Sequence, residues 1–177
     1  EKIFSLYKFR SMTDERDLEG NLLPDEIRLT KFGKWLRSTS LDELPETFNI
    51  LNGSMSLIGP RPQLVRDILF MTYEQRLRHT VKPGLSGLAQ VNGRNDISWE
   101  EKLNWDLKYL EHISFLSDVK IILQTVIKAF VKKEGITDGD MATAYDYGVW
   151  LLKKGKVTKE EYEKKQEEAK SLLKKAR

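Results

Sequence analysis

The sequence predicts an α+β fold: a compact, mostly helical domain around a small β-sheet, followed by a C-terminal helical hairpin. Three observations support this prediction. Residues 3–10, IFSLYKFR, alternate as a strand does, with Lys8 and Arg10 on the same face. Several later segments combine a helix-capping residue with a run of helix-forming residues. A chain of 177 residues, 40% of them apolar, can bury one ordinary core.

The segment after the predicted strand is a loop and then a short helix. Residues 13–26 are polar and contain Gly20 and Pro24, which favour a loop. Thr30 is in position to cap a helix over TKFGKWLRS. The apolar stripe of that helix consists of Phe32, Trp35 and Leu36.

Two starts are open for the next helix. Ser40 and Glu43 fit a capping box, in which each side chain bonds the backbone amide of the other residue. Pro45 conflicts with this start, because at the fifth helical position it has no amide to donate. A helix that begins at Asp42 or Glu43 places Pro45 in the first turn, where proline is favoured.

The middle of the chain mixes rigid segments with helices. Residues 51–62 are predicted to form a turn, an apolar stretch and a rigid extended segment, and residues 63–79 a helix. Residues 81–94, VKPGLSGLAQVNGR, carry three glycines and one proline, which indicates a loop with one short strand.

Two further helices complete the main part of the chain. Ser98 and Glu101 form a capping box at the start of a helix over 98–113. A strongly apolar helix is predicted over 117–133. Core packing and binding to an anionic bilayer both explain its apolar face, and core packing is favoured.

The composition changes near residue 135, and we predict a main domain over 1–134 and a C-terminal helical extension over 135–177. The linker GITDGD leads to a helix over 141–155, closed by Gly155, and to a second helix capped by Thr158. A lid, a dimerisation hairpin, a membrane-surface contact and a solvated appendage are the open roles of this extension, and the last is favoured.

Composition excludes several classes of protein. The absence of cysteine excludes a disulfide scaffold and a thiolate nucleophile, and two histidines make a zinc cluster improbable. No stretch approaches the roughly 18 apolar residues of a membrane-spanning helix. The net charge is +3, and the first 130 residues carry 18 basic and 18 acidic side chains, so nucleic acid is not an expected partner.

Asp42 and Glu43 are the candidate catalytic pair. Both carboxylates are explained by helix capping and by the helix dipole, which is the reading this feature alone favours. A second reading is a divalent metal site, because Mg²⁺ prefers one or two carboxylates plus phosphate oxygens and water. An aspartate beside such a metal can attack phosphorus and form an acyl phosphate.

Basic and polar side chains extend this phosphate reading. Arg61 lies between Pro60 and Pro62, which leave its backbone little freedom and present a guanidinium suited to phosphate. The other candidate substrate-binding residues are Lys8, Arg10, Arg37, Gln90 and Arg94. Each of these alone is more often an ordinary surface or loop residue.

Several motifs in this order resemble the bacterial sugar transferase family, the membrane-associated phosphoglycosyl transferases. These motifs are YKFRSM, RLTKFGKWLRSTSLDELPETFNILNGSMSLIGPRP, KPGLSGLAQVNGR and DLKYLEHISFLSDVKIILQTV. The resemblance covers roughly residues 1–130.

The resemblance implies a specific reaction. Such enzymes transfer a sugar phosphate from a UDP-sugar to a polyprenyl phosphate with Mg²⁺ as cofactor and release UMP, as the first membrane step of polysaccharide or glycoconjugate synthesis. It implies that Asp42 is the nucleophile of a covalent phosphosugar-aspartyl intermediate and that Glu43, with Asp42, holds the metal. Lys8, Arg10, Arg37 and Arg61 fall on basic positions suited to diphosphate or lipid phosphate, and Gln90 and Arg94 on the nucleotide side.

The resemblance also implies a location and partners. Family members carry an apolar membrane-inserted segment before the first motif, and this chain begins at Glu1 without it. We therefore expect a peripheral or soluble chain that works at the cytoplasmic face of the bacterial inner membrane, against the membrane surface, with a homodimer as one expected assembly. Two rival readings are a hydrolase of nucleotide sugars and a binding module without chemistry.

Overall fold

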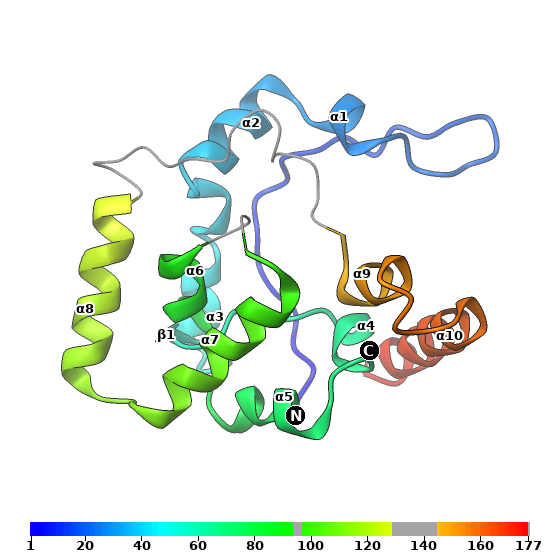
Figure 1. Cartoon of the computed structure of the whole chain (residues 1–177). Coiled ribbons are helices and arrows are strands. Elements are labelled where there is room, and N and C mark those ends of the chain that lie inside the picture. The colour runs from blue at the N-terminus through cyan, green and yellow to red at the C-terminus, as the bar shows by residue number, and fades with distance from the viewer. Residues whose placement is uncertain (94–96, 129–144, 177) are drawn as a thin grey trace.

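The structure is a computed structural model of the chain and describes residues 1–93, 97–128 and 145–176. Helices surround a two-stranded sheet, and α9 and α10 lie beside α4 (Figure 1). The elements are α1 (Asp25–Arg28), α2 (Lys31–Ser38), η1 (Leu41–Glu43), α3 (Glu46–Leu51), β1 (Ser56–Ile58), α4 (Val65–Ile68), α5 (Tyr73–Arg76), η2 (Leu77–Thr80), β2 (Gly84–Ser86), α6 (Leu88–Asn92), α7 (Trp99–Glu111), α8 (Phe115–Val126), α9 (Tyr147–Lys153) and α10 (Lys159–Lys175). The predicted α+β class is confirmed.

The sheet lies where the sequence predicts an apolar stretch and a short strand. β1 and β2 pair in parallel, with Ser56 opposite Gly84 and Ile58 opposite Ser86. Their backbones approach so closely that a Cβ on Gly84 would lie 2.1 Å from the amide nitrogen of Gly59. The segment that leads from β1 into Gly59 and the segment of β2 that begins with Gly84 are therefore packed backbone to backbone.

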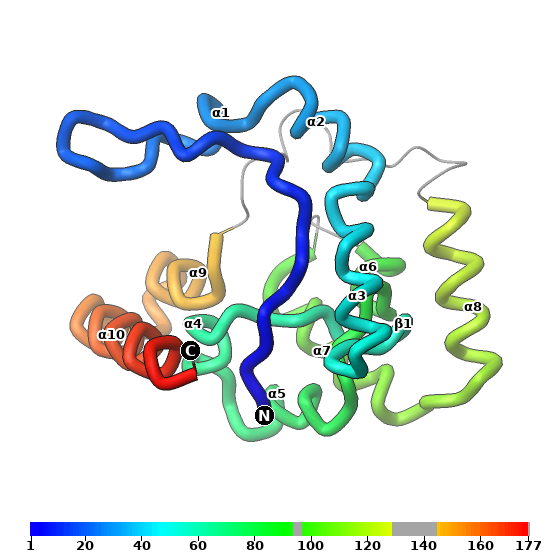
Figure 2. The backbone as a smooth tube through the Cα atoms, turned by 180° about the vertical axis from the view of Figure 1, so that it is seen from behind, coloured from blue at the N-terminus to red at the C-terminus, as the bar shows by residue number. Residues whose placement is uncertain are grey.

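The prediction of a strand over 3–10 is wrong. These residues run as a nearly straight segment from near α5 past α3 toward α2 (Figure 2). Their neighbours are η1 and α3, whose backbone groups mostly bond within their own turns. Phe9 donates its amide to the Asp42 carbonyl at 2.9 Å, but a ladder cannot form against a helix.

The start of the helix near Ser40 differs from both predicted alternatives. Ser40 has a left-handed backbone with φ of 56°, and its side chain caps nothing, so the predicted capping box is wrong. A single 3₁₀ turn carries Asp42 and Glu43, and the α-helix begins only at Glu46, after Pro45. Proline has no amide to donate, so it is accommodated at the N-cap position.

The single helix predicted over 63–79 is also wrong. The segment is divided into α4, α5 and η2. Thr72 and Gln75 form a capping box that starts α5 as a separate helix. The signature of that box is present in the sequence as Thr-x-x-Gln.

Other helix predictions are confirmed. Thr30 accepts the amide of Gly33 at the start of α2, and Ser98 and Glu101 form the capping box of α7. Thr158 caps α10, and Gly155 follows α9 with φ of 67°. The helix predicted over 141–155 starts later than predicted, because Asp146 caps α9 at Tyr147. The helix predicted over 117–133 begins earlier, because Ser114 caps α8 at Phe115.

Two apolar clusters form the core. One contains Ile58, Val91, Tyr109 and Ile121 and packs β1 against α6, α7 and α8. The other contains Phe70, Met71, Leu103, Tyr147 and Leu151. Among the described residues, no helix combines the length and apolarity that crossing a bilayer requires.

The second cluster joins the C-terminal extension to the rest of the chain. Tyr147 and Leu151 of α9 are 3% and 7% exposed and pack against Phe70 and Leu103. The interpretation of the tail as a solvated appendage is therefore wrong for residues 145–176. The predicted domain boundary at 134/135 lies outside the described residues.

Candidate active site

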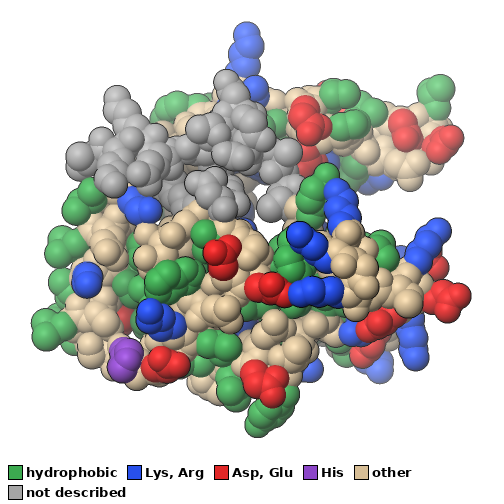
Figure 3. Space-filling model, in the orientation of Figure 1, with side chains coloured by type: hydrophobic (Ala, Val, Ile, Leu, Met, Phe, Trp, Pro, Cys, Tyr) green, Lys and Arg blue, Asp and Glu red, His purple; other side chains and the backbone are tan. Residues whose placement is uncertain are grey.

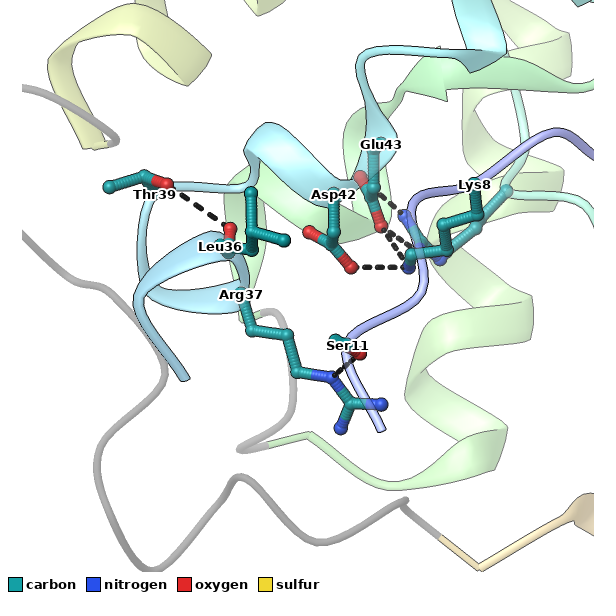
Figure 4. A network of polar contacts seen from close by, with 8 residues as sticks. Lys8, Ser11, Leu36, Arg37, Thr39, Asp42 and Glu43 are labelled. Atoms are coloured by element: carbon teal, nitrogen blue, oxygen red, sulfur yellow. Dashed lines mark hydrogen bonds and ion pairs between the residues drawn. The ribbon is translucent and has the colours of Figure 1, made fainter. Parts of the chain in front are cut away.

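Asp42 and Glu43 lie on the 3₁₀ turn η1, between α2 and α3. The left-handed Ser40 ends α2 abruptly and turns the chain, so that both carboxylates face the same side (Figure 4). Asp42 is buried, with 4% of its surface exposed, and Glu43 is partly buried. The sequence predicts both carboxylates at the start of a helix. In the structure they lie on the tight turn η1, before α3 begins.

Lys8 reaches both carboxylates. Its Nζ lies 3.0 Å from Asp42 Oδ2 and 3.1 Å from Glu43 Oε1. The residues on either side of Lys8 fix its backbone, because Tyr7 donates its amide to Asn49 Oδ1 at 3.0 Å and Phe9 donates to the Asp42 carbonyl at 2.9 Å. Two adjacent anchors therefore present the ammonium group to the dyad.

Arg61 approaches Glu43 from a different element. Its Nη2 pairs with Glu43 Oε1, and its Nη1 donates to Glu43 Oε2 at 3.4 Å. Arg61 comes three residues after the end of β1, so the parallel pairing of β1 and β2 constrains where its side chain leaves the backbone. The carboxylate accepts from both arms of the guanidinium, as a planar fork allows.

These two cations control the charge of Glu43. Burial alone would raise its pKa, but the attraction of Arg61 and then of Lys8 outweighs burial and lowers the pKa of Glu43 to about 2. Glu43 is therefore an anion at any physiological pH.

The donor set fits magnesium only with help from a substrate. Asp42 and Glu43 offer carboxylate oxygens, and Mg²⁺ completes its shell with phosphate oxygens and water. Among the described residues, no group of three or more His, Asp or Glu side chains is assembled that would hold a metal ion without other ligands. The residues present fit a metal that binds together with a diphosphate.

The other predicted site residues lie on different elements and bond to different partners. Arg37 lies on α2, and its Nε donates to Ser11 Oγ at 2.9 Å (Figure 4). Arg10 is exposed and pairs with Asp14. Gln90 lies on α6 and donates from Nε2 to the Leu85 carbonyl at 3.2 Å. Arg94 lies outside the described residues.

Two buried residues near the dyad were missed by the sequence reasoning. Glu46, one turn after Glu43, is 1% exposed, and burial followed by the negative charge of Glu43 raises the pKa of Glu46 to about 7. Asn49 is 1% exposed and also donates from Nδ2 to the Ser5 carbonyl at 2.8 Å. The i, i+3 spacing of Glu43, Glu46 and Asn49 was a usable signal, because residues three apart along a helical backbone lie on the same side.

A buried ion pair behind Arg61 was also missed. Arg78 and Asp106 are 1% and 2% exposed and bond to each other. They are 28 residues apart and look like ordinary charges of surface helices in the sequence. No local pattern could have paired them.

Comparison with known proteins finds similarity in the part of the chain that carries the candidate active site. The model of the family described as bacterial sugar transferase matches residues 1–132. A protein of Bacillus subtilis (strain 168) named uncharacterized sugar transferase EpsL is 54% identical over 143 residues, which cover 81% of this chain and 70% of that protein.

Two longer relatives have more specific names. The UDP-glucose:undecaprenyl-phosphate glucose-1-phosphate transferase of Klebsiella pneumoniae is 44% identical over 75% of this chain and 30% of its own length. The undecaprenyl-phosphate galactose phosphotransferase of Salmonella typhimurium is 34% identical over 76% of this chain and 32% of its own length. The chain thus spans about a third of these longer relatives.

Proposed function

The chain belongs to the bacterial sugar transferase family, and from this premise we propose that it transfers a sugar phosphate from a UDP-sugar to a polyprenyl phosphate and releases UMP. The observation that carries the proposal is the cluster of Lys8, Asp42, Glu43 and Arg61, two carboxylates faced by two cations. The names of the longer relatives support the two substrates.

The proposed reaction has two displacements at one phosphorus. A carboxylate oxygen of Asp42 attacks the phosphorus that carries the sugar, the bond to the UMP oxygen breaks, and UMP leaves with the bonding electrons. An oxygen of the polyprenyl phosphate then attacks the same phosphorus and releases the Asp42 carboxylate. The product is a polyprenyl diphosphate sugar, and the enzyme is regenerated.

The side chains of the cluster have distinct proposed roles. Lys8 and Arg61 neutralise charge on the diphosphate oxygens, and Glu43 orients Arg61 and holds Mg²⁺ with Asp42. When bound, Mg²⁺ withdraws charge from the phosphate oxygens and from the leaving UMP. Arg37 and Arg10 are proposed to bind the diphosphate or the lipid phosphate, and Gln90 and Arg94 are proposed for the nucleotide side.

We also propose that the chain acts at the membrane surface on the cytoplasmic face of the inner membrane, because a polyprenyl acceptor is held by a bilayer. Exposed apolar side chains support this. Green side chains line the edge of the molecule over α8 (Figure 3), and the exposed residues there are Phe115, Leu116, Leu123, Val126 and Ile127. Sedimentation with anionic and neutral vesicles tests the location, and light scattering tests the expected homodimer.

Intact-protein mass spectrometry tests the reaction. The protein is mixed with Mg²⁺ and, separately, UDP-glucose, UDP-galactose and their N-acetylamino counterparts, beside Asp42→Asn. We expect one sugar to add the mass of a sugar phosphate, with one UMP released, and no adduct on Asp42→Asn. UMP release from both proteins without any adduct would favour hydrolysis, and ligand binding without release would favour a binding module.

A further inference from the structure

Behind the candidate active site, the guanidinium of Arg78 binds two acceptors from different elements. Its Nε and Nη2 donate to Asp106 Oδ2 on α7 at 2.9 and 2.7 Å. Nη2 also donates to the backbone carbonyl of Arg61 at 2.6 Å. Arg78 lies on η2, so three segments of the chain meet at one buried side chain.

Stability alone is a weak reason for such a pair. Two buried charges lose their hydration, and apolar side chains of the same size often stabilise a core equally well. An apolar pair here would leave the Arg61 carbonyl without its donor. The bond to the Arg61 carbonyl is therefore the feature that distinguishes Arg78 from an ordinary member of a buried ion pair.

The backbone around Arg61 needs such an anchor. Pro60 and Pro62 have no amide to donate, so the segment can be held only through its carbonyls and the Arg61 amide. Gly84 of β2 donates to the Pro60 carbonyl at 3.0 Å, and Arg78 donates to the next carbonyl, that of Arg61. The two bonds fix the peptide groups on both sides of the Arg61 Cα.

Fixing these peptides sets the direction in which the Arg61 side chain leaves the backbone. That side chain ends on Glu43, as described above. A displacement of the carbonyl by one ångström would be carried to the guanidinium, and misplacement of that size is enough to slow a reaction about a hundredfold. Lysine at position 78 keeps the charge but lacks the planar fork that serves Asp106 and the carbonyl together.

We propose that Arg78 and Asp106 are positioning residues that hold Arg61 on the candidate active site through its backbone carbonyl. Neither residue touches substrate. The inference rests on the proposed function only in that Arg61 is taken to bind phosphate.

The first test measures Arg61 directly and needs no catalysis. The ¹⁵N-detected Nε–Hε signal of Arg61 is assigned by its loss in Arg61→Lys. We expect this signal to shift and broaden in Arg78→Lys and in Asp106→Asn. The matched control is Asp67→Asn, which removes a carboxylate that is 3% exposed and accepts the Tyr147 amide of the C-terminal extension instead. An unchanged Arg61 signal in folded Arg78→Lys would overturn the proposal.

The second test uses transfer rates with the UDP-sugar that gives an adduct on the wild-type protein. At equal folded fraction, we expect Arg78→Lys and Asp106→Asn to lower kcat about ten- to a hundredfold, with a smaller change in KM, and Asp67→Asn to lower it less. In the Arg61→Lys background, Arg78→Lys should add less than about a twofold further loss, because its effect passes through Arg61.

The outcomes separate the two proposals. Independent, multiplicative losses from Arg61→Lys and Arg78→Lys would overturn the positioning role. A wild-type protein that forms no adduct with any sugar would contradict the proposed function, and the Arg61 signal would still decide the positioning role.

Discussion

At the scale of single residues, Glu46 has an environment that disfavours the charged form of its carboxyl group. It is 1% exposed, and its Oε1 has no hydrogen-bond partner among the described residues. An ionised Glu46 would sit beside Glu43 in a dehydrated site, although Arg61 and Lys8 offset part of that cost. The folded protein therefore binds a proton at Glu46 more tightly than the unfolded chain does.

Glu46→Gln should remove a pH dependence of stability. Because the pKa of Glu46 rises from 4.5 to about 7 on folding, wild-type stability is highest below pH 4.5 on this account and falls as pH rises toward 7. One pKa unit corresponds to about 1.4 kcal/mol, so at pH 8 Glu46→Gln should be more stable by up to about 3 kcal/mol. Urea denaturation at pH 5 and pH 8 measures the difference. Parallel pH profiles in the two proteins would show that Glu46 ionises normally.

Lys8→Gln should slow the transfer strongly. The variant removes the charge that lies 3.0 Å from Asp42 and leaves the backbone anchors on Asn49 and Asp42 in place. Loss of one donor to a developing charge typically lowers kcat about a hundredfold. Steady-state UMP release measures it. Arg10→Gln changes a neighbouring cation that pairs with Asp14, and we expect a smaller loss; an equal loss would place Arg10 at the site.

At the scale of elements, the contact between β1 and β2 determines the position of the backbone that leads to Arg61. Gly59 lies at the end of β1 and donates its amide to the Ser86 carbonyl at 2.9 Å. A Cβ on Gly87 would lie 2.2 Å from the Gly59 carbonyl oxygen. Glycine at these positions is needed for backbone contact and not for a left-handed turn.

Gly84→Ala should disturb both stability and activity. The added Cβ would lie 2.1 Å from the Gly59 nitrogen, so the strands must separate, which typically costs about 1–3 kcal/mol. The Pro60 carbonyl would lose its bond to the residue 84 amide, so kcat should fall as well. Thermal unfolding and UMP release report the two effects. Gly155→Asn, at an open left-handed position, should change neither greatly; equal effects would show that the close strand contact is not the cause.

At the scale of the whole molecule, α9 and α10 complete the core of the domain that carries the site. Asp67 of α4 accepts the amide of Tyr147 at 2.9 Å, and Trp99 of α7 donates its indole N–H to the Tyr145 carbonyl at 2.9 Å. Phe70 stacks on Tyr162 of α10 with ring centroids 5.9 Å apart. Residues outside the matched family segment therefore hold α4 and α7 together.

Leu151→Ala should destabilise the whole domain. Leu151 is 7% exposed in the core cluster shared with Phe70 and Leu103, and such truncations typically cost about 2–5 kcal/mol. Leu173→Ala on α10 is the matched control, because Leu173 is 45% exposed and its loss should change stability by less than about 0.5 kcal/mol. Urea denaturation followed by tryptophan fluorescence and by circular dichroism measures both. Two separate transitions would show that the extension folds independently.

Local chemistry explains which parts of the fold were predictable. Caps at Thr30, Ser98 and Thr158 were readable because a side chain bonds an amide three residues away. The strand over 3–10 was not, since its alternation is satisfied equally by a straight segment lying on α3. The break at Thr72 shows a local signal that was present and missed.

By itself, the sequence determined the family and the fold class and singled out the candidate acidic pair, because these depend on ordered motifs and on interactions between near neighbours. The tertiary structure alone decided which cations meet that pair. Lys8 and Arg61 reach Glu43 from 35 and 18 residues away, while Arg10 turns to Asp14. Contacts over such separations depend on how strands and helices pack in three dimensions, and a linear pattern does not contain that packing. The same reason explains why Arg78 and Asp106 became visible only in the folded chain.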